Sequence, residues 1–351
     1  MASSNREVQD FIDLNKILKL NDSNEIKRMQ NEFETNGWCF VLLTTELILD
    51  KELVKDISDF FSFDDDKDKY SQSAPIYGYS KINHREGIKL LTGNYFIDFA
   101  YISLVPISLL QPLNYLSQVL DAATKRLIEV LDQHCVFQNK PSLSNLIEQG
   151  NLPLEEQHFG MLDIVSYFNE KFGFQPPENG QSTEEVNCVP HYDPGLLSIS
   201  ILSTYEGLQL KNMITNEWID GPLESNIGVI WLGEAASRIT ENRLKPGIHR
   251  VIYPRESKRR LTIWYELCTI EQLKSISDEK KDELMLEETV IFRSLHRLNG
   301  ITVLPGEKRL EFLKRIEMGF GLSMSKFVPR YHLEKHNILY PTEDLKTLNH
   351  L

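Results

Sequence analysis

Short runs of apolar or alternating residues, separated by Gly, Pro and Asn, occupy the chain between residues 161 and 268. Runs of this length with frequent turn signals predict β-strands, and many such strands in succession are typical of a β-sandwich or β-barrel. We therefore predict a mostly β core. Its expected strands are residues 162–168, 196–202, 207–210, 227–232, 247–253 and 261–267.

Helical periodicity is found on both sides of this core. Asp22 and Glu25 have the spacing of a helix capping box, and apolar residues follow them at helical spacing. Two further helical stripes begin near residues 49 and 112. We expect one integrated unit with three parts, namely an N-terminal helical and strand region that packs on the core (1–160), the core itself (161–268) and a C-terminal helical extension (269–351).

His191 and Asp193 are the first candidates for chemistry. On an extended strand, residues i and i+2 point to the same side, so this imidazole and carboxylate can bind one ion. His249 lies in a second strand-like run. Two histidines and one carboxylate leave several positions open for a cosubstrate and O₂, and this donor set suits Fe(II). Zinc is the chief alternative, although hydrolytic zinc sites keep one open position and often take two histidines from one helix.

Arg260 and Thr262 begin the last predicted strand of the core. A guanidinium beside a hydroxyl is a natural receptor for a carboxylate, which it binds through two parallel charge-assisted hydrogen bonds. In an iron oxygenase this carboxylate would be the distal end of 2-oxoglutarate. Arg259 lies on the opposite face of the strand, and the register can be read in either direction.

Ordered segments between residues 8 and 268 resemble the isopenicillin N synthase-like family of 2-oxoglutarate/Fe(II)-dependent dioxygenases. The family's His-x-Asp strand corresponds to HYDPGLLSI (191–199), its distal-histidine segment to NRLKPGIHRVIYP (242–254), and its Arg-x-Ser pair to RLT (260–262). In the N-terminal region, further family segments correspond to QDFIDLNKI (9–17), ETNGWCFVLL (34–43) and GYSKINHREGIKL (78–90). The ordered combination is far more specific than any single segment.

The resemblance implies a double-stranded β-helix, or jelly roll, with flanking helices. It also implies Fe(II) as the metal, 2-oxoglutarate and O₂ as cosubstrates, and binding of 2-oxoglutarate by Arg260 and Thr262. The implied iron ligands are His191, Asp193 and His249.

The chain departs from the family pattern at three positions. Thr262 replaces the usual serine and keeps its hydroxyl. A family tyrosine that reaches 2-oxoglutarate has its counterpart in Tyr167 or, in the other register, in Phe168, which has no hydroxyl. Trp231 begins a Trp-Leu-Gly-Glu stretch where the family usually has Asn-x-Gly-Asp, so we expect an altered pocket floor.

The implied activity is hydroxylation, desaturation or oxidative cyclisation of a small-molecule substrate, such as an amino-acid derivative or a specialised metabolite, with succinate and CO₂ as coproducts. Two alternatives remain open. One is an iron oxidase of the same fold that does not use 2-oxoglutarate, which the presence of Arg260 disfavours. The other is a non-catalytic jelly-roll binding protein, which the intact set of metal ligands disfavours.

Net charge, the length of apolar runs and the spacing of cysteines limit the partners and the cellular location that we expect. The formal net charge of −13 at pH 7 disfavours binding to nucleic acid or to an anionic membrane. The sequence contains no run of 18 apolar residues and begins with a polar segment, so we expect neither a membrane span nor a secretory signal. Four scattered cysteines form no metal-binding or disulfide pattern. We therefore expect a cytoplasmic monomer.

Overall fold

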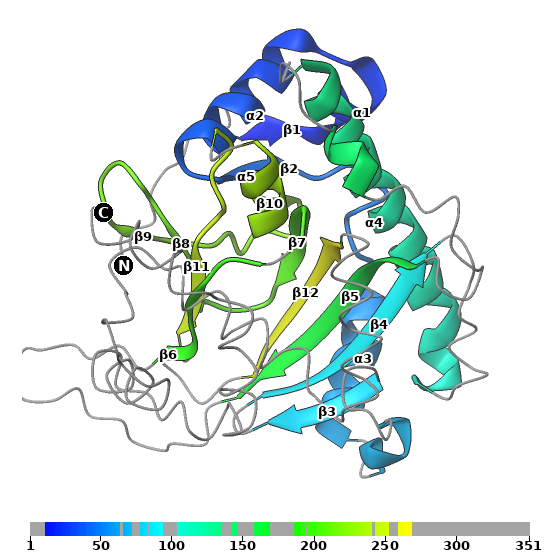
Figure 1. Cartoon of the computed structure of the whole chain (residues 1–351). Helices are drawn as coiled ribbons and strands as arrows, with labels where there is room; N and C mark the ends of the chain where they lie inside the picture. The colour runs from blue at the N-terminus through cyan, green and yellow to red at the C-terminus, as the bar shows by residue number, and fades with distance from the viewer. Residues whose placement is uncertain are drawn as a thin grey trace, which may run out of the picture.

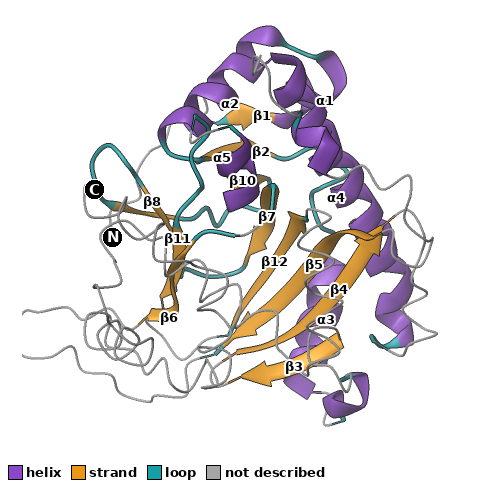
Figure 2. Cartoon of the chain, in the orientation of Figure 1, coloured by secondary structure: helices purple, strands orange, loops and turns teal. Residues whose placement is uncertain are grey.

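Two β-sheets face each other across a cavity, and helices cover the outer side of the larger sheet (Figure 1, Figure 2). The residues described by this computed structural model are 11–63, 66–71, 78–82, 85–93, 104–134, 142–146, 158–168, 186–193, 195–240, 243–252 and 259–268.

The larger sheet has eight strands within the described residues, in the order β1-β2-β10-β7-β12-β5-β4-β3. The β1–β2 pair is parallel, and the other neighbours run antiparallel. The strands are β1 (Ile12–Asp13), β2 (Trp38–Leu42), β3 (Gly78–Ile82), β4 (Arg85–Gly93), β5 (His158–Tyr167), β7 (Leu197–Ser203), β10 (Ile227–Leu232) and β12 (Arg260–Leu267).

The smaller sheet has four strands within the described residues, in the order β6-β11-β8-β9. Apart from the β8–β9 hairpin, successive strands from β6 to β12 alternate between the two sheets, which is the winding of a double-stranded β-helix. The strands of this sheet are β6 (Val186–His191), β8 (Leu208–Lys211), β9 (Trp218–Asp220) and β11 (His249–Ile252).

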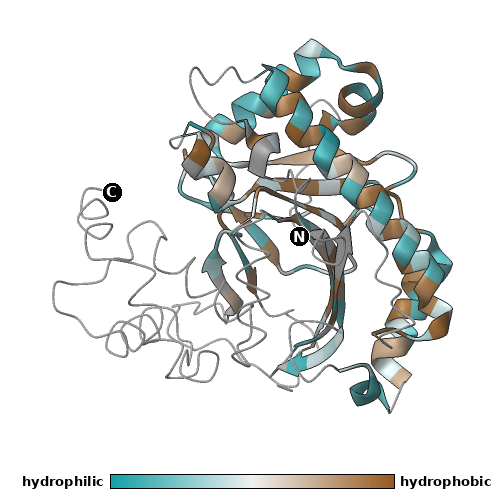
Figure 3. Cartoon of the chain, turned by 45° about the vertical axis from the view of Figure 1, so that its right-hand side comes forward, coloured by the Kyte–Doolittle hydropathy of each residue, from teal (hydrophilic) through white to brown (hydrophobic). Residues whose placement is uncertain are grey.

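Helix α4 packs across β4, β5, β7 and β12 of the larger sheet, and the shorter helices α1 and α2 pack against α4. In Figure 3 the long helices carry both hydrophobic and hydrophilic residues, as amphipathic helices do. No helix in the described part of the chain combines the length and the hydropathy that crossing a bilayer requires. The helices are α1 (Leu14–Leu20), α2 (Ser23–Thr35), α3 (Lys51–Phe63), α4 (Ile107–His134), α5 (Glu234–Ile239) and the 3₁₀ turns η2 (Lys67–Tyr70) and η3 (Leu143–Leu146).

Strand β12 separates the hydrophobic core from the cavity. Side chains alternate between the two faces of a strand, and on one face Leu261, Ile263, Tyr265 and Leu267 belong to the core under the helices. The Tyr265 hydroxyl also donates a hydrogen bond to Asp121 of α4 at 2.8 Å. The alternate residues of β12 face the cavity between the sheets, where the site lies. They are Arg260, Thr262, Trp264 and Glu266.

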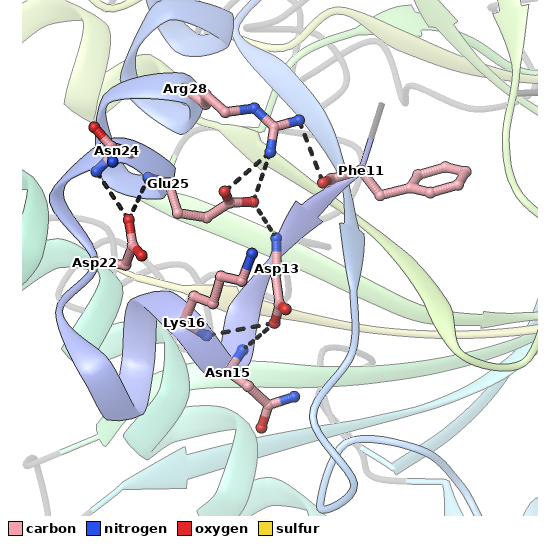
Figure 4. A network of polar contacts seen from close by, with 8 residues as sticks. All are labelled: Phe11, Asp13, Asn15, Lys16, Asp22, Asn24, Glu25 and Arg28. Carbon is pink, nitrogen blue, oxygen red and sulfur yellow. Dashed lines mark hydrogen bonds and ion pairs between the residues drawn. The ribbon is translucent and has the colours of Figure 1, made fainter. Parts of the chain in front are cut away.

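The start of α2 confirms the predicted helix, but only half of the predicted capping box (Figure 4). The Asp22 carboxylate accepts hydrogen bonds from the backbone N–H groups of Asn24 and Glu25 at 2.9 and 3.0 Å. Glu25 does not return a bond to Asp22. Its carboxylate accepts from the backbone N–H of Asp13 at 2.7 Å and from Arg28 at 2.9 Å, so it ties α2 to the end of β1.

The expected strands of the core correspond to β5, β7, β8, β10, β11 and β12. The larger sheet is not confined to residues 161–268, because β1, β2, β3 and β4 pair with its other strands. The predicted helical extension, 269–351, lies outside the described residues. The three-part division of the chain therefore stays a prediction.

Candidate metal centre

The structure brings the three predicted metal ligands together, with one donor atom from each lying within 4.8 Å of the others. His191 is the last residue of β6 and lies opposite His249, the first residue of β11. We expected His191 and Asp193 on one strand, and this detail is wrong. Strand β6 ends at His191, and Asp193 lies in the following loop. All three side chains are buried.

The Asp193 loop is held by backbone contacts with the segment that follows β10. The N–H of Glu234 donates to the Asp193 carbonyl at 2.7 Å, and the N–H of Gly233 donates to the Leu196 carbonyl at 3.0 Å. A Cβ atom on Gly233 would lie 2.1 Å from the Gly195 carbonyl oxygen and 2.9 Å from that of Asp193. The absence of a side chain at Gly233 is therefore a condition for this close approach.

The two carboxylate oxygens of Asp193 have different surroundings. Oδ1 lies 3.8 Å from Nε2 of His191 and 3.8 Å from Nε2 of His249. Oδ2 accepts hydrogen bonds from the Ser198 hydroxyl at 2.5 Å and from the Trp231 indole N–H at 2.6 Å. The three atoms that face one another are therefore two imidazole nitrogens and one carboxylate oxygen.

A backbone carbonyl orients one of the two imidazoles. Nδ1 of His249 lies 3.1 Å from the Gly247 carbonyl oxygen. A carbonyl oxygen can only accept, so Nδ1 carries the proton and donates it. The lone pair is then on Nε2, the nitrogen that faces Asp193, and a metal-binding histidine is commonly oriented in this way.

The local electrostatics favour a cation at this point. Burial raises the pKa of Asp193, but the nearby His249 and His191 and the hydrogen bonds from Ser198 and Trp231 outweigh burial, so the pKa lies below its usual value. Burial, followed by the proximity of His191, lowers the pKa of His249 to about 4. Near neutral pH the site therefore holds an ionised carboxylate and a neutral His249, the forms that bind a metal.

Arg260 lies in the same cavity and has an unsatisfied donor. Its side chain is only 1% exposed, and its Nη1 has no hydrogen-bond partner among the described residues. Nε donates to the Ser203 hydroxyl at 2.9 Å and to the Tyr205 carbonyl at 3.1 Å. Burial lowers the pKa of Arg260 to about 10, so the guanidinium is still charged at neutral pH. Buried donors are rarely left unsatisfied, so this nitrogen points to a missing anionic ligand.

Arg259, the residue before β12, points to the other face of the sheet. Its guanidinium donates to the buried carboxylate of Glu86 and, at 3.2 Å, to the Ser166 hydroxyl, and it lies 5.0 Å from the centre of the Phe168 ring. In this register Arg260 faces the cavity and Arg259 faces away from it.

The other two predicted contacts to 2-oxoglutarate also line the cavity. Tyr167 lies opposite Arg260 in the sheet, and the Arg260 guanidinium is 5.2 Å from the centre of the Tyr167 ring. The alternative, Phe168, lies beside Arg259 instead. Thr262 is buried, and its hydroxyl donates to the Leu202 carbonyl at 2.9 Å.

The comparison with known proteins agrees with this geometry. The model of the 2OG-Fe(II) oxygenase superfamily matches residues 164–269, which include His191, Asp193, His249 and Arg260. Residues 164–269 belong to this superfamily. The resemblance found in the sequence is thereby confirmed at the level of the superfamily.

A curated relative and two solved structures extend the comparison. The 2-oxoglutarate-dependent dioxygenase citB of Monascus ruber is 29% identical over 122 residues, a match that spans 33% of this chain and 37% of the relative. The dioxygenase for auxin oxidation 1 of Arabidopsis thaliana, in its complex with 2-oxoglutarate, superposes with a TM-score of 0.55 at 18% identity, covering 74% of this chain and 92% of that one. The dioxygenase for auxin oxidation of rice gives a TM-score of 0.56 at 15% identity, covering 73% of this chain and 82% of that one.

At these identities the solved structures speak for the fold alone, and they confirm the predicted jelly roll. The match with citB covers little more than a third of that protein.

The cavity between the sheets contains charged residues beyond the predicted ones. Its empty volume is about 790 Å³, part of which is continuous with solvent. Lys89 of β4 and Asp163 of β5 form an ion pair at 3.0 Å in its wall, and Arg85 and Glu266 also line it. The pattern of residues 85–93 did not predict a strand, so Lys89 was missed. Arg85 lies in the segment 78–90 that resembles the family.

Proposed function

We propose that the protein is an Fe(II)- and 2-oxoglutarate-dependent oxygenase that hydroxylates, desaturates or oxidatively cyclises a small-molecule substrate. One observation supports this proposal above the others. The cavity that contains the cluster of two imidazoles and one carboxylate also contains a buried guanidinium with an unsatisfied donor. A zinc hydrolase requires the first feature but not the second, and a binding protein without catalysis requires neither.

His191, Asp193 and His249 would hold the iron, through two neutral imidazoles and one ionised oxygen. Arg260 would bind the distal carboxylate of 2-oxoglutarate, with Thr262 and Tyr167 beside it. When bound, iron and 2-oxoglutarate supply the oxidising chemistry, in which the cosubstrate is oxidised to succinate and CO₂ as O₂ is consumed.

The protein's own part is to place the groups and to exclude water. Leu208, Val251 and Trp264 line the cavity together with the polar residues, and apolar walls strengthen every electrostatic contact inside a site. The buried position of Arg260 therefore increases its affinity for a carboxylate.

The substrate would lie beside the iron and 2-oxoglutarate residues, along β4 and the part of β5 near Asp163. This wall carries Arg85 and the Lys89–Asp163 ion pair, so we propose a substrate with polar or ionised groups rather than a pure hydrocarbon. We further propose that the protein acts as a cytoplasmic monomer and binds neither nucleic acid nor membranes, in line with its negative charge.

An anaerobic titration tests the proposal. The metal-free protein is mixed with Fe(II) and then with 2-oxoglutarate, and the visible difference spectrum is recorded. We expect a charge-transfer band that needs both additions and saturates at one equivalent of each. A band that forms without 2-oxoglutarate, or turnover that proceeds in its absence, would favour the oxidase. Binding of zinc but not Fe(II) would contradict the proposal.

A further inference from the structure

Trp231 connects the larger sheet to the cluster of metal-binding side chains. It lies near the end of β10, between Trp38 of β2 and Ser198 of β7 in the sheet register, and its side chain is buried. Its indole N–H donates to Oδ2 of Asp193 at 2.6 Å. The hydroxyl of its sheet neighbour Ser198 donates to the same oxygen at 2.5 Å.

These two donors make the two oxygens of the carboxylate unequal. A carboxylate oxygen has two lone pairs, and both lone pairs of Oδ2 are engaged by Trp231 and Ser198. Oδ1 of Asp193 is left to face the two imidazole nitrogens, at 3.8 Å from each. Hydrogen bonds to an ionised acceptor are among the strong ones, so this division should persist when a cation binds.

The same tryptophan supports a second ligand. Its ring lies 4.7 Å from that of His249, measured between centroids, with an angle of 44° between the planes. A Cβ atom on Gly247 would lie only 2.4 Å from the Cβ of Trp231. Trp231 therefore packs directly on Gly247, whose carbonyl accepts the Nδ1 proton of His249.

We propose that Trp231 and Ser198 are positioning residues of the metal centre, which leave Oδ1 as the only oxygen of Asp193 available to the metal. Trp231 also fixes the orientation of His249. The inference rests on the proposed function, because it presupposes a metal held by Asp193 and His249. Trp231 thus has a specific task at a position where the related family usually has asparagine.

The test uses Trp231→Phe, which keeps a ring beside His249 and removes the N–H, and Ser198→Ala, which removes the other donor with little change in volume. Trp218→Phe is the matched control, since Trp218 lies in β9 and does not line the cavity. Each metal-free protein is titrated with Co(II) alone under anaerobic conditions, and affinity and the visible d–d spectrum are recorded.

We expect each of the two variants to bind Co(II) about 10–100-fold more weakly, the usual effect of losing a hydrogen bond to a metal ligand. We also expect weaker d–d bands, because a released Oδ2 can join the coordination sphere and d–d intensity falls as the coordination number rises. Trp218→Phe should match the wild-type protein in both respects. If Trp231→Phe fails to fold, Ser198→Ala decides the matter alone.

Wild-type affinity and spectrum in both variants would overturn the inference and leave the proposed function standing. Weaker binding with an unchanged spectrum would also overturn it, because a merely structural role gives that result. A wild-type protein that binds neither Co(II) nor Fe(II) would refute the proposed function and the inference together.

Discussion

Replacement of Arg260 by alanine should weaken binding of 2-oxoglutarate far more than binding of iron. The guanidinium is 1% exposed, and two of its contacts, to Ser203 and Tyr205, hold it in place while Nη1 stays without a partner among the described residues. In Arg260→Ala the distal carboxylate would enter the same buried space without the guanidinium that faces it in the wild-type protein. Removing one partner of a buried charge pair costs roughly 3–5 kcal/mol, which is about 10²–10³-fold in affinity at roughly 1.4 kcal/mol per decade.

Arg259→Ala is the control for this prediction. Arg259 has the same side chain and the adjacent position, but it faces Glu86 and Phe168 on the other side of the sheet. Anaerobic titration with 2-oxoglutarate at saturating Fe(II) measures the dissociation constant in both variants, and a separate Fe(II) titration measures metal binding. The reasoning would be refuted by an Arg260→Ala variant that binds 2-oxoglutarate as tightly as Arg259→Ala does.

Three further predictions concern the metal site and the sheet behind it. Replacing any one of the three metal-facing side chains by alanine should abolish iron-dependent turnover, with circular dichroism unchanged; near-normal activity in one variant would remove that residue from the ligand set. Gly233→Ala should weaken metal binding more than about 10-fold, since its Cβ would collide with the Gly195 carbonyl and displace Asp193; an unchanged Co(II) affinity would contradict this. Burial raises the pKa of Glu86, but hydrogen bonds from Lys67, Tyr79 and Arg259 outweigh burial, so the pKa lies below its usual value. The ionised carboxylate therefore stabilises the fold above its unfolded pKa of about 4.3, and this stabilisation is lost as pH falls through the folded pKa. Glu86→Gln should therefore lower the free energy of unfolding by about 1–3 kcal/mol at pH 7 and by less near pH 4, as urea titrations would show; an equal loss at both pH values would contradict the assignment.

The fold and the metal-facing residues could be predicted because they depend on local pattern. The alternation in residues 261–267 predicts a strand with one apolar face, and the structure has β12 there. His191 and Asp193 could be paired because they are two residues apart, even though Asp193 proves to lie beyond the strand end. The prediction that His249 joins them in one site needed the resemblance as well, since spacing alone does not predict that β6 and β11 pair.

The supporting residues could not be predicted, because their contacts depend on which strands become neighbours. Trp231 and Ser198 meet at Asp193 only because β10 and β7 pair with Trp231 opposite Ser198. The choice between Tyr167 and Phe168 depended on the pairing of β5 with β12, which places Tyr167 opposite Arg260. A shift of one residue would exchange the two faces.

The capping residue Glu25 shows the same limit on a small scale. Its spacing from Asp22 predicted a reciprocal capping box, but its carboxylate bonds to Asp13 and Arg28. Local spacing identified the helix start, while the partner of the glutamate was decided by the approach of β1 to α2, which no local pattern records.

Succinate formation tests the central claim most directly. The wild-type chain is incubated with 2-oxoglutarate labelled at the carbons that are retained in succinate, with and without Fe(II) and with and without O₂, alongside Asp193→Ala and Arg260→Ala. Even without an identified substrate, 2-oxoglutarate oxygenases are expected to consume the cosubstrate slowly. We predict labelled succinate that requires both Fe(II) and O₂, vanishes in Asp193→Ala and falls sharply in Arg260→Ala at subsaturating 2-oxoglutarate. Absence of succinate from wild-type protein that binds both Fe(II) and 2-oxoglutarate, or equal succinate from all three proteins, would contradict the account.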